Sequence, residues 1–431
     1  MTLSFPRRHV AVSIVCPIIP ANVIPLIKYL EALNQTLHSR PTLEHPLFHN
    51  IKTHHFCRWT VLPASTGRHG TYPAQLLFES NIDTSLDQYL ELLVQQDRET
   101  LTAIYQHCEG FEAASIKRYL SERNIIAPVH FRGAHYHSQQ QIQDDQALYK
   151  ELESFINEKH INGSLINYFD LGLKEQLSKN LKAKGTNWPF STVQKQPKPY
   201  WPTLLGGIAL LLALLPFLAL PLGMFFGAWY IALRKHEKAD IPEIHNNDMA
   251  ARHSHIRHVT QEEQQAVQSP MTSIVEIKPG RFRLITLNVV LWAINLLADI
   301  FYNKGKLGSI NTIHFARWLI IDNNKRLVFL SNYDGSWENY LGDFIDRAAM
   351  GLTAVWSNAE GFPAAKRLLL QGAKNDIEFK AYARKSQLKT HCWYSAYPEL
   401  TLQNVLNNSH IRQGFNRPMN EKQLSKWLAR F

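Results

Sequence analysis

The chain has 431 residues, of which 45% are hydrophobic and 19% charged, and its formal net charge is +10. This length predicts two or three domains, and the apolar fraction excludes a chain that is disordered throughout. The positive charge could indicate nucleic acid, but the sequence has no Lys/Arg-dense helix and no RNA-binding signature. Because much of the excess charge flanks one apolar run, we expect membrane lipids as partners and no nucleic acid.

The first 160 residues alternate between strand and helix patterns. Residues 9–16, HVAVSIVC, are typical of a β-branched strand, and residues 22–37 have helical periodicity. Two strands, a long helix, a short helix and a last strand are expected to follow. Their predicted ranges are, in chain order, 54–62, 74–80, 85–107, 116–122 and 127–135.

Residues 271–415 give the same order of elements after a long apolar run. A strand, an apolar helix that starts at Arg283, two strands, a helix that starts at Ser336 and a last strand are predicted. The strand ranges are 272–278, 313–321, 326–331 and 390–397. Both halves therefore have the order β-α-β-β-α-β of the ferredoxin-like unit.

An internal repeat supports this division of the chain. Residues 80–111 and 331–362 align without a gap, with 12 identities in 32 positions, and both end in Glu-Gly-Phe. A His-Phe-x-Arg-Trp block also recurs, at residues 55–59 and 314–318. The loop after this block is eight residues longer in the first copy, as expected of a surface turn between two strands.

Two such units in one chain resemble the dimeric α/β-barrel superfamily, in which two ferredoxin-like sheets pair as dimers or as fused pseudo-dimers. The resemblance covers residues 8–160 and 271–415. It implies an α+β fold of two tandem ferredoxin-like repeats that form a pseudo-dimeric α/β barrel, with an inserted hydrophobic membrane hairpin. The predicted segments are the first repeat (1–170), a basic linker (171–202), the hairpin (203–233), a His-rich linker (234–270) and the second repeat (271–431).

Residues 203–233 contain no charged side chain. A straight helix of this length would measure about 46 Å, more than the roughly 30 Å of a hydrocarbon core. Pro216 and Pro221 interrupt its middle, and both flanks carry basic residues and interfacial aromatics, among them Trp201 and Trp229. We expect a hairpin that enters one leaflet and returns, with both repeats on the cytoplasmic side; one kinked span is the alternative.

The helix predicted at residues 283–302 corresponds to the first-copy helix at residues 22–37, but it has almost no polar face. A helix that is apolar on all sides either lies deep in a core or faces lipid. We expect its outer face, with Trp292, to lie against the bilayer. Burial under the partner repeat is the alternative.

Four polar residues recur in both copies: His55/His314, Arg58/Arg317, Asn81/Asn332 and Asp83/Asp334. On a strand, residues three apart point to opposite faces, so the His and the Arg cannot share a pocket unless a bulge intervenes. The two Asp residues precede predicted helices and are expected to cap them. Glu109 and Glu360 end a helix, where a carboxylate is unfavourable, and Arg58 and Arg317 are their expected partners.

The second copy alone contains Tyr-Asp-Gly at residues 333–335 and is rich in aromatics. The superfamily includes haem proteins, among them chlorite dismutases and dye-decolourising peroxidases, and the Asp-Gly pair resembles the distal acid of the latter. This likeness implies a haem, for which His391 and His410 are the available ligands.

Our first hypothesis is a membrane-attached oxidoreductase that acts on a lipid-like or aromatic apolar substrate, with haem as its candidate cofactor. Its proposed catalytic residues are His314 and Asp334 for proton transfer and Arg317 for an oxyanion. The alternative is a non-catalytic lipid-binding or scaffold protein. Residues expected to line a pocket or to hold the fold are His55, Arg58, Asn81, Asp83, Asn332, Tyr340, Glu360 and Trp318.

No metal site or nucleotide site is predicted. The four cysteines form no CxxC motif, and two of them, Cys57 and Cys108, align with alanines, as expected of small buried side chains. His253, His255 and His258 lack metal-site spacing and are expected in a solvated linker. The sequence contains no P-loop, GxGxxG, GxSxG or HExxH motif. The N-terminal apolar run lacks a small-residue cleavage site, so we expect no signal peptide and a reducing compartment.

Overall fold

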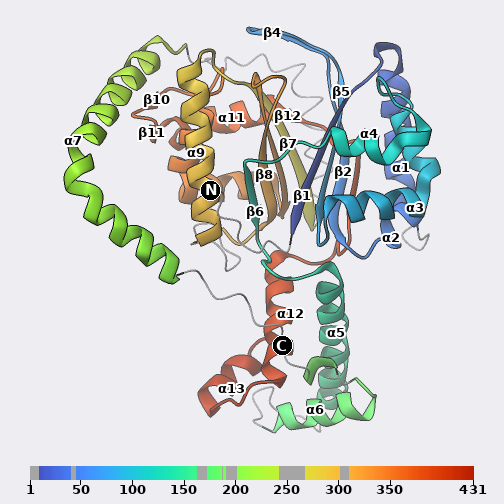
Figure 1. Ribbon diagram of the computed structural model, residues 1–431. Helices are drawn as coiled ribbons and strands as arrows, with labels where there is room; N and C mark the ends of the chain where they lie inside the picture. Colours follow the sequence, from blue (N-terminus) through green and yellow to red (C-terminus); the bar gives the residue numbers. More distant parts are fainter. Residues whose placement is uncertain are drawn as a thin grey trace.

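The computed structural model describes residues 9–39, 45–162, 172–186, 188–190, 201–241, 267–300 and 310–431. It is a mixed α+β structure. Two antiparallel sheets lie against each other, with helices on their outer faces and a stalk of helices at one end (Figure 1). The His-rich stretch with His253, His255 and His258 lies outside the described residues.

The first sheet has the strand order β1-β5-β2-β13. Its outer face carries the alternate residues Cys57, Trp59 and Val61, which pack under helices in one hydrophobic core. The strands are β1 (Val10–Pro17), β5 (Gln75–Ile82), β2 (His54–Leu62) and β13 (Cys392–Ser395), and the helices are α1 (Val23–Ser39), α2 (Pro46–His49), α3 (Leu86–Tyr105) and α4 (Ile116–Glu122).

The second sheet has the order β12-β7-β9-β8-β6. Ala316, Trp318 and Phe329 of its outer face belong to a second core. The strands are β12 (Gln387–Leu388), β7 (Gln268–Glu276), β9 (Arg326–Asp334), β8 (Ile313–Ile321) and β6 (Val129–Arg132), and the helices are α9 (Arg281–Ile300), α10 (Trp337–Trp356) and α11 (Asp376–Ser386).

The two halves exchange their last strands. β6 of the N-terminal half pairs with β8, and β13 of the C-terminal half pairs with β2. Before each crossing the chain touches its own sheet, through a bridge from Asn124 to Ile14 and through the pairing of β12 with β7. Each sheet therefore contains a strand from the other half of the sequence.

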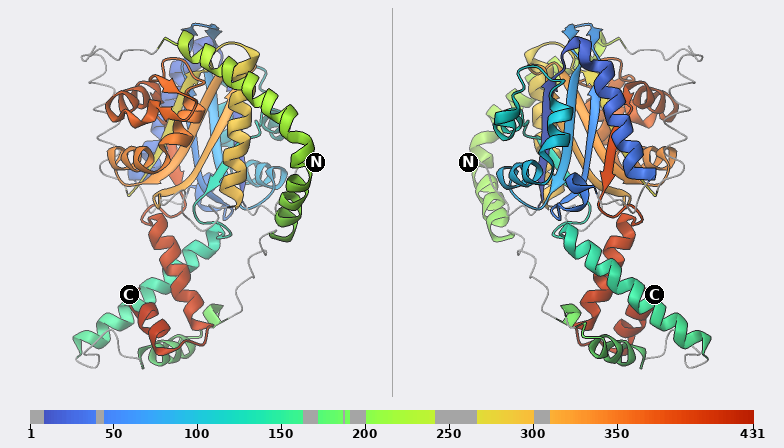
Figure 2. Two further views of the ribbon diagram at one scale, coloured as in Figure 1. Left: turned by 90° about the vertical axis from the view of Figure 1, so that its left-hand side faces the viewer. Right: turned by 90° about the vertical axis from the view of Figure 1, so that its right-hand side faces the viewer.

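The sequence did not predict the stalk. Its long helices α5 (Gln139–Ile161) and α12 (Leu402–Phe415) follow the two exchanged strands and cross each other in Figure 2. A buried ion pair between Asp145 and Arg412, 2.5 Å apart, joins them. A separate apolar core that includes Leu152, Leu177 and Trp427 holds the base. The remaining stalk elements are α6 (Leu173–Ala183), η3 (Trp188–Phe190) and α13 (Glu421–Leu428).

The strands and helices predicted within the two repeats are present. β2 and α4 have the predicted bounds, and Ser85 and Ser336 form the N-caps of α3 and α10. The longer loop of the first copy forms a hairpin of β3 (Ser65–Gly67) and β4 (Gly70–Tyr72). The other short elements are β10 (Ala365–Lys366), β11 (Leu370–Gln371), η1 (Pro20–Asn22), η2 (Ala113–Ser115) and η4 (Gly372–Lys374).

The apolar run forms one helix, α7 (Trp201–Ala239), and not the predicted hairpin. Pro216 and Pro221 both lie within α7, which Figure 1 shows as an arc that does not turn back on itself. A proline removes one backbone hydrogen bond and bends a helix, but a turn also needs residues that favour one. The segment around these prolines is instead rich in leucine and alanine, which favour helix.

A buried charge cluster joins the inner faces of the two sheets. The Glu79 carboxylate accepts from Arg58 Nε at 2.5 Å and lies 2.9 Å from Arg317. All three side chains are at most 1% exposed. Burial alone would raise the pKa of Glu79, but Arg58 and Arg317 outweigh it and hold the pKa below its ordinary value. This single carboxylate therefore connects two arginines that occupy equivalent positions in the two copies.

We predict that Glu79→Gln lowers the free energy of unfolding by about 3–5 kcal/mol, because it leaves two buried arginines without their shared carboxylate. Urea unfolding of the purified protein, followed by tryptophan fluorescence, measures the change. Glu91→Gln is the control, since Glu91 pairs with Lys117 at the surface and should not change the midpoint. Equal midpoints for wild type and Glu79→Gln would contradict the prediction.

Candidate functional site

A β-bulge at the start of β2 turns His55 towards the second sheet. The pairing of β2 with β5 shifts register between His54 and Phe56, and β8 has the same irregularity between Ile313 and Phe315. Simple alternation would place His55 with Cys57 and Trp59 on the outer face. The bulge places it on the inner face with Arg58 instead, which is the exception that the sequence argument left open.

Each inward-facing histidine meets the aspartate of its own copy. His55 Nε2 lies 3.0 Å from Asp83 Oδ1, and His314 Nε2 lies 2.7 Å from Asp334 Oδ1. The second oxygen of each carboxylate accepts a backbone N–H at 2.7 Å, from Gln139 and Leu402, the first residues of α5 and α12. The two aspartates thus hold the N-termini of the stalk helices. The sequence predicted that they would cap α3 and α10, but Ser85 and Ser336 form those caps.

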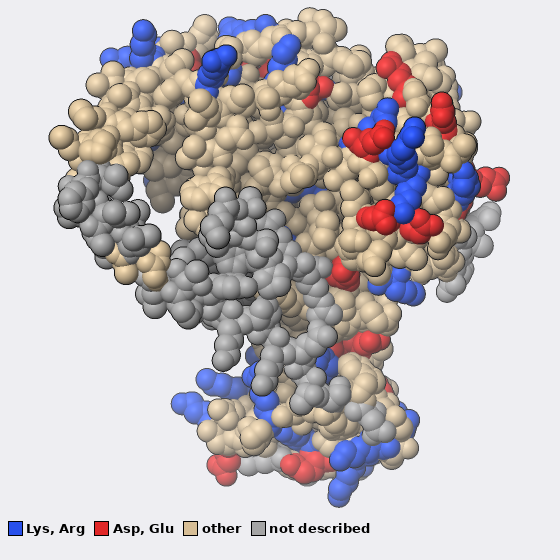
Figure 3. Space-filling model, in the orientation of Figure 1, with Lys and Arg blue, Asp and Glu red and all other residues tan. Residues whose placement is uncertain are grey.

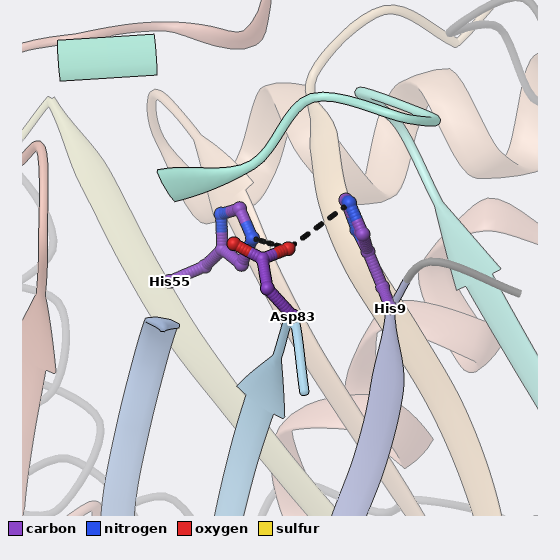
Figure 4. A group of neighbouring side chains, drawn as sticks. All are labelled: His9, His55 and Asp83. Atoms are coloured by element: carbon purple, nitrogen blue, oxygen red, sulfur yellow. Dashed lines mark hydrogen bonds and ion pairs between the residues drawn. The ribbon is translucent and has the colours of Figure 1, made fainter. Parts of the chain in front are cut away.

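The two His–Asp pairs differ in their further neighbours. His9, just before β1, brings its Nε2 to 3.5 Å from Asp83 Oδ1, and Figure 4 shows both imidazoles aimed at that oxygen. The register of β7 on β9 puts Gln268 at the equivalent position in the second copy. The Gln268 amide donates to the carbonyl oxygens of Tyr397 and Leu400. The first copy alone therefore combines two imidazoles and one carboxylate.

Tyr397 adds a second asymmetry. This residue follows β13, and its hydroxyl lies 2.9 Å from His55 Nδ1. Burial raises the pKa of Tyr397 well above its ordinary value, and the nearby carboxylates of Asp83 and Asp334 raise it further. The phenol therefore stays protonated and can exchange a hydrogen bond with the imidazole. His55 contacts Asp83 through one ring nitrogen and Tyr397 through the other.

The cluster His9, His55 and Asp83 is closed in by aromatic rings. The centroids of the His9 and His55 rings are 4.8 Å apart, and both rings contact Phe315. Both histidines are buried, whereas Asp83 is partly exposed. Among the described residues, these three offer ligand atoms that all lie within 4.8 Å of one another. Two imidazole nitrogens and a carboxylate oxygen are a donor set suited to a first-row transition metal.

The predicted catalytic Arg317 belongs to the charge cluster. Its guanidinium donates to the carbonyl oxygens of Val12 and Ser80, as well as contacting Glu79. Asn81 donates to Glu79 at 2.8 Å, and Asn332 accepts from Trp393 at 3.2 Å. These contacts tie strands together across the inner faces of the sheets.

The predicted pairing of Glu109 and Glu360 with the arginines is wrong. Arg58 and Arg317 pair with Glu79, while Glu360 contacts Arg68 and His69 of the β3–β4 hairpin. Glu79 escaped the sequence comparison because its equivalent in the second copy is Leu330. A carboxylate within a strand of apolar residues was the available signal.

The two histidines proposed for haem lie apart from the His–Asp pairs. His391 accepts a hydrogen bond from the Val61 amide near the end of β2. Val61 is six positions after His55 on this strand, which places it on the order of 20 Å from His55. His410 lies on stalk helix α12. The structure therefore does not bring the haem candidates to His314, and haem binding stays a prediction.

Two other predicted residues lie in the second core. Tyr340 stacks on Tyr333 and lines a small cavity there, and Trp318 packs on Phe329 and Trp356.

We predict that His391 makes stability depend on pH. Burial lowers its pKa from 6.5 to about 4. Between these pH values the unfolded chain binds a proton that the folded chain does not, so stability falls as the pH drops from 6.5 to 4. This loss totals about 3 kcal/mol for one histidine. His391→Gln keeps an acceptor for the Val61 amide but cannot bind this proton. Its urea midpoints at pH 7 and pH 4.5 should therefore differ less than those of wild type. An equal fall of the midpoint in both proteins would refute this.

Sequence reasoning found His55, His314, Asp83 and Asp334 through the repeat, but it missed His9, Gln268 and Tyr397. These three residues differ between the copies, so a search for shared residues passes over them. No protein-family model, curated protein or solved structure matches the chain, and its function is therefore inferred from this geometry.

Proposed function

We propose that this is a membrane-attached protein that lies against one leaflet of a bilayer through α7 and α9. The observation that carries the proposal is the exposure of α7. Residues 219–228, ALPLGMFFGA, are all exposed, so this part of the helix presents an apolar surface on every side. Each large apolar side chain costs about 1.5–3 kcal/mol when left in water, and a helix that is apolar all round is typical of lipid contact.

The outer face of α9 extends this apolar surface. Leu287, Leu291 and Ala298 pack into the second core, while Ile285, Val289 and Trp292 on the other side are 58–64% exposed. Among the described residues, one helical window, Arg281–Ala298, has the length and apolar composition of a membrane span, and only 28% of it is buried. Because its inner face packs on the second sheet, α9 suits a position along the membrane surface better than across it.

Charged side chains border this surface at one end. Arg234, Lys235 and Lys238 follow the apolar part of α7, and Arg281 begins α9. Figure 3 shows Lys and Arg along the upper edge, while the surface below it over α9 and the adjoining part of α7 shows no charge. Basic side chains beside an apolar face favour anionic lipid headgroups. The cytoplasmic side remains the expected location.

The strand orders support the interpretation as two ferredoxin-like repeats. β1-β5-β2 and β7-β9-β8 are equivalent antiparallel sets, and each is followed by a helix and a strand that joins the opposite sheet. We propose a fused pseudo-dimer in which the last strands are exchanged. The paired inner faces then place both His–Asp pairs at the stalk end.

We further propose that the region of the two His–Asp pairs, His55–Asp83 and His314–Asp334, acts on, or binds, an apolar molecule that reaches it from the leaflet. As an enzyme it would use His314 and Asp334 for proton transfer, the pair that the sequence also indicated. A non-catalytic lipid-binding or scaffold protein is the second candidate, favoured by the burial of both histidines. Oxidoreductase chemistry remains a prediction from the sequence.

Single cysteines test the attachment of α9 to the bilayer. Val289→Cys and Trp292→Cys introduce a thiol on its outer face. The matched control is Ile377→Cys on α11, because the Ile377 side chain is 80% exposed. The four native cysteines are buried, which keeps background labelling low. In proteoliposomes we expect a water-soluble maleimide to label the α9 positions at least about tenfold more slowly than the control, with equal rates after detergent is added.

Lipid and protein cover can be distinguished with a fluorophore at position 289. Quenching by nitroxide-labelled lipids would support contact with the bilayer. Equal labelling of all three positions, or slow labelling of the α9 positions without quenching by these lipids, would contradict the proposal.

A further inference from the structure

We infer that His9, His55 and Asp83 form a binding site for one divalent first-row transition-metal ion, and that the equivalent site of the second copy has lost this capacity through Gln268. The inference goes beyond membrane attachment and does not depend on it. It rests on the distances among three donor atoms, the groups that orient them, and the difference between the copies.

The Asp83 carboxylate lies at ligand spacing from both imidazoles, and the ligand atoms of all three residues lie within 4.8 Å of one another. Asp83 Oδ1 lies 3.0 Å from His55 Nε2 and 3.5 Å from His9 Nε2. Neighbouring ligands about 2.0–2.1 Å from an octahedral or tetrahedral ion are separated from one another by roughly 2.8–3.4 Å. A modest shift of the imidazoles would therefore give all three donors bonding distances to one ion. His9 immediately precedes β1, His55 lies at the bulge of β2 and Asp83 immediately follows β5, so the sheet itself brings them together.

In Asp83 and His55, the atom that does not face the site is held by another group. Asp83 Oδ2 accepts the Gln139 amide, which leaves Oδ1 directed at the two imidazoles. The hydroxyl of Tyr397 lies 2.9 Å from His55 Nδ1 and can accept a hydrogen bond from its N–H, which would fix the tautomer whose Nε2 lone pair is available to a metal ion. A metal-binding histidine is commonly held in this way through its second nitrogen.

The chemistry of the donors selects the class of ion. Ca²⁺ and Mg²⁺ favour all-oxygen sites, whereas two imidazoles and one carboxylate suit Zn²⁺, Fe²⁺ and their neighbours. With three protein ligands, a further coordination position remains for water or a bound molecule. The four cysteines belong to no such cluster among the described residues.

The second copy provides an internal comparison. His314 and Asp334 repeat the His–Asp contact at 2.7 Å, so this contact alone does not require a metal. Gln268 stands where the first copy has His9, and its amide is bound to backbone carbonyls and to Ser395. The difference between a metal site and a plain hydrogen-bonded pair is therefore one residue.

Zn²⁺ and Co²⁺ binding to the full-length protein, purified in detergent without a histidine tag, tests the inference. We expect wild type to bind one ion per chain at this site, and His9→Gln, which copies the second repeat, to weaken Zn²⁺ affinity at least about 100-fold. His314→Gln is the matched control, a buried histidine–aspartate pair broken in the other copy, and should retain wild-type affinity. Bound Co²⁺ should show d–d absorption without thiolate charge-transfer bands.

A gain of binding provides an independent variant. Gln268→His should create a second site with His314 and Asp334 and raise the Co²⁺ stoichiometry from one to two. Zn²⁺ should also raise the unfolding temperature of wild type and leave that of His9→Gln unchanged. The inference is overturned if wild type shows no Zn²⁺-dependent rise in unfolding temperature, or if His9→Gln and His314→Gln affect Zn²⁺ affinity equally. Either result leaves membrane attachment intact, since that is read from labelling of α9.

Discussion

The exchange of the last strands is the constraint on which the rest of this structure depends. Because β6 completes the second sheet and β13 the first, neither sheet can be assembled from one half of the sequence. Each crossing also carries the chain to the stalk end, where Gly133 and Ala396 donate their amides to the carbonyl oxygens of His314 and His55. A Cβ at Gly133 would lie 2.2 Å from the Ile313 carbonyl oxygen, so the crossing there requires glycine. The His–Asp pairs are thus built at the positions where the two halves interlock.

Divergence between the copies concentrates at this interlock. Ala134 and Tyr397 occupy equivalent crossing positions, but only the tyrosine reaches a histidine, and that histidine belongs to the other copy. A second pair of equivalent positions holds Glu79 in the first copy and Leu330 in the second, and the single carboxylate of Glu79 contacts both Arg58 and Arg317. Two carboxylates there would have neutralised the arginines one to one, whereas a single one obliges both sheets to share it. The two halves of the chain are therefore joined by contacts that differ between the copies.

The sequence predicted local elements well because their signals are local. The bounds of β2 and α4 follow from apolar alternation and helical periodicity, and the caps of α3 and α10 follow from Ser85 and Ser336. The stalk was not predicted, although α5 carries apolar residues at helical spacing, Ile142, Leu148, Leu152 and Ile156, because it lies beyond the last strand of the repeated unit. Strand exchange could not be predicted, since the same residues satisfy a strand in either sheet. The bulge at His55 depends on pairing with β5, which periodicity within one strand does not report.

The position of α7 follows from how its C-terminal end is fixed. Glu237 accepts the backbone amides of Arg367 and Leu368, two residues with positive φ, and Asp240 pairs with Arg283 and Lys278. His236 stacks on Phe282, and Trp229 donates to Thr286, so the contacts of the described side chains lie in the last third of the helix. Residues 219–228 are exposed and include no polar side chain that would interact favourably with water. A helix fixed at its charged end and exposed along its apolar part would have a lower free energy with that part in hydrocarbon, and this difference is the physical basis of the proposed attachment.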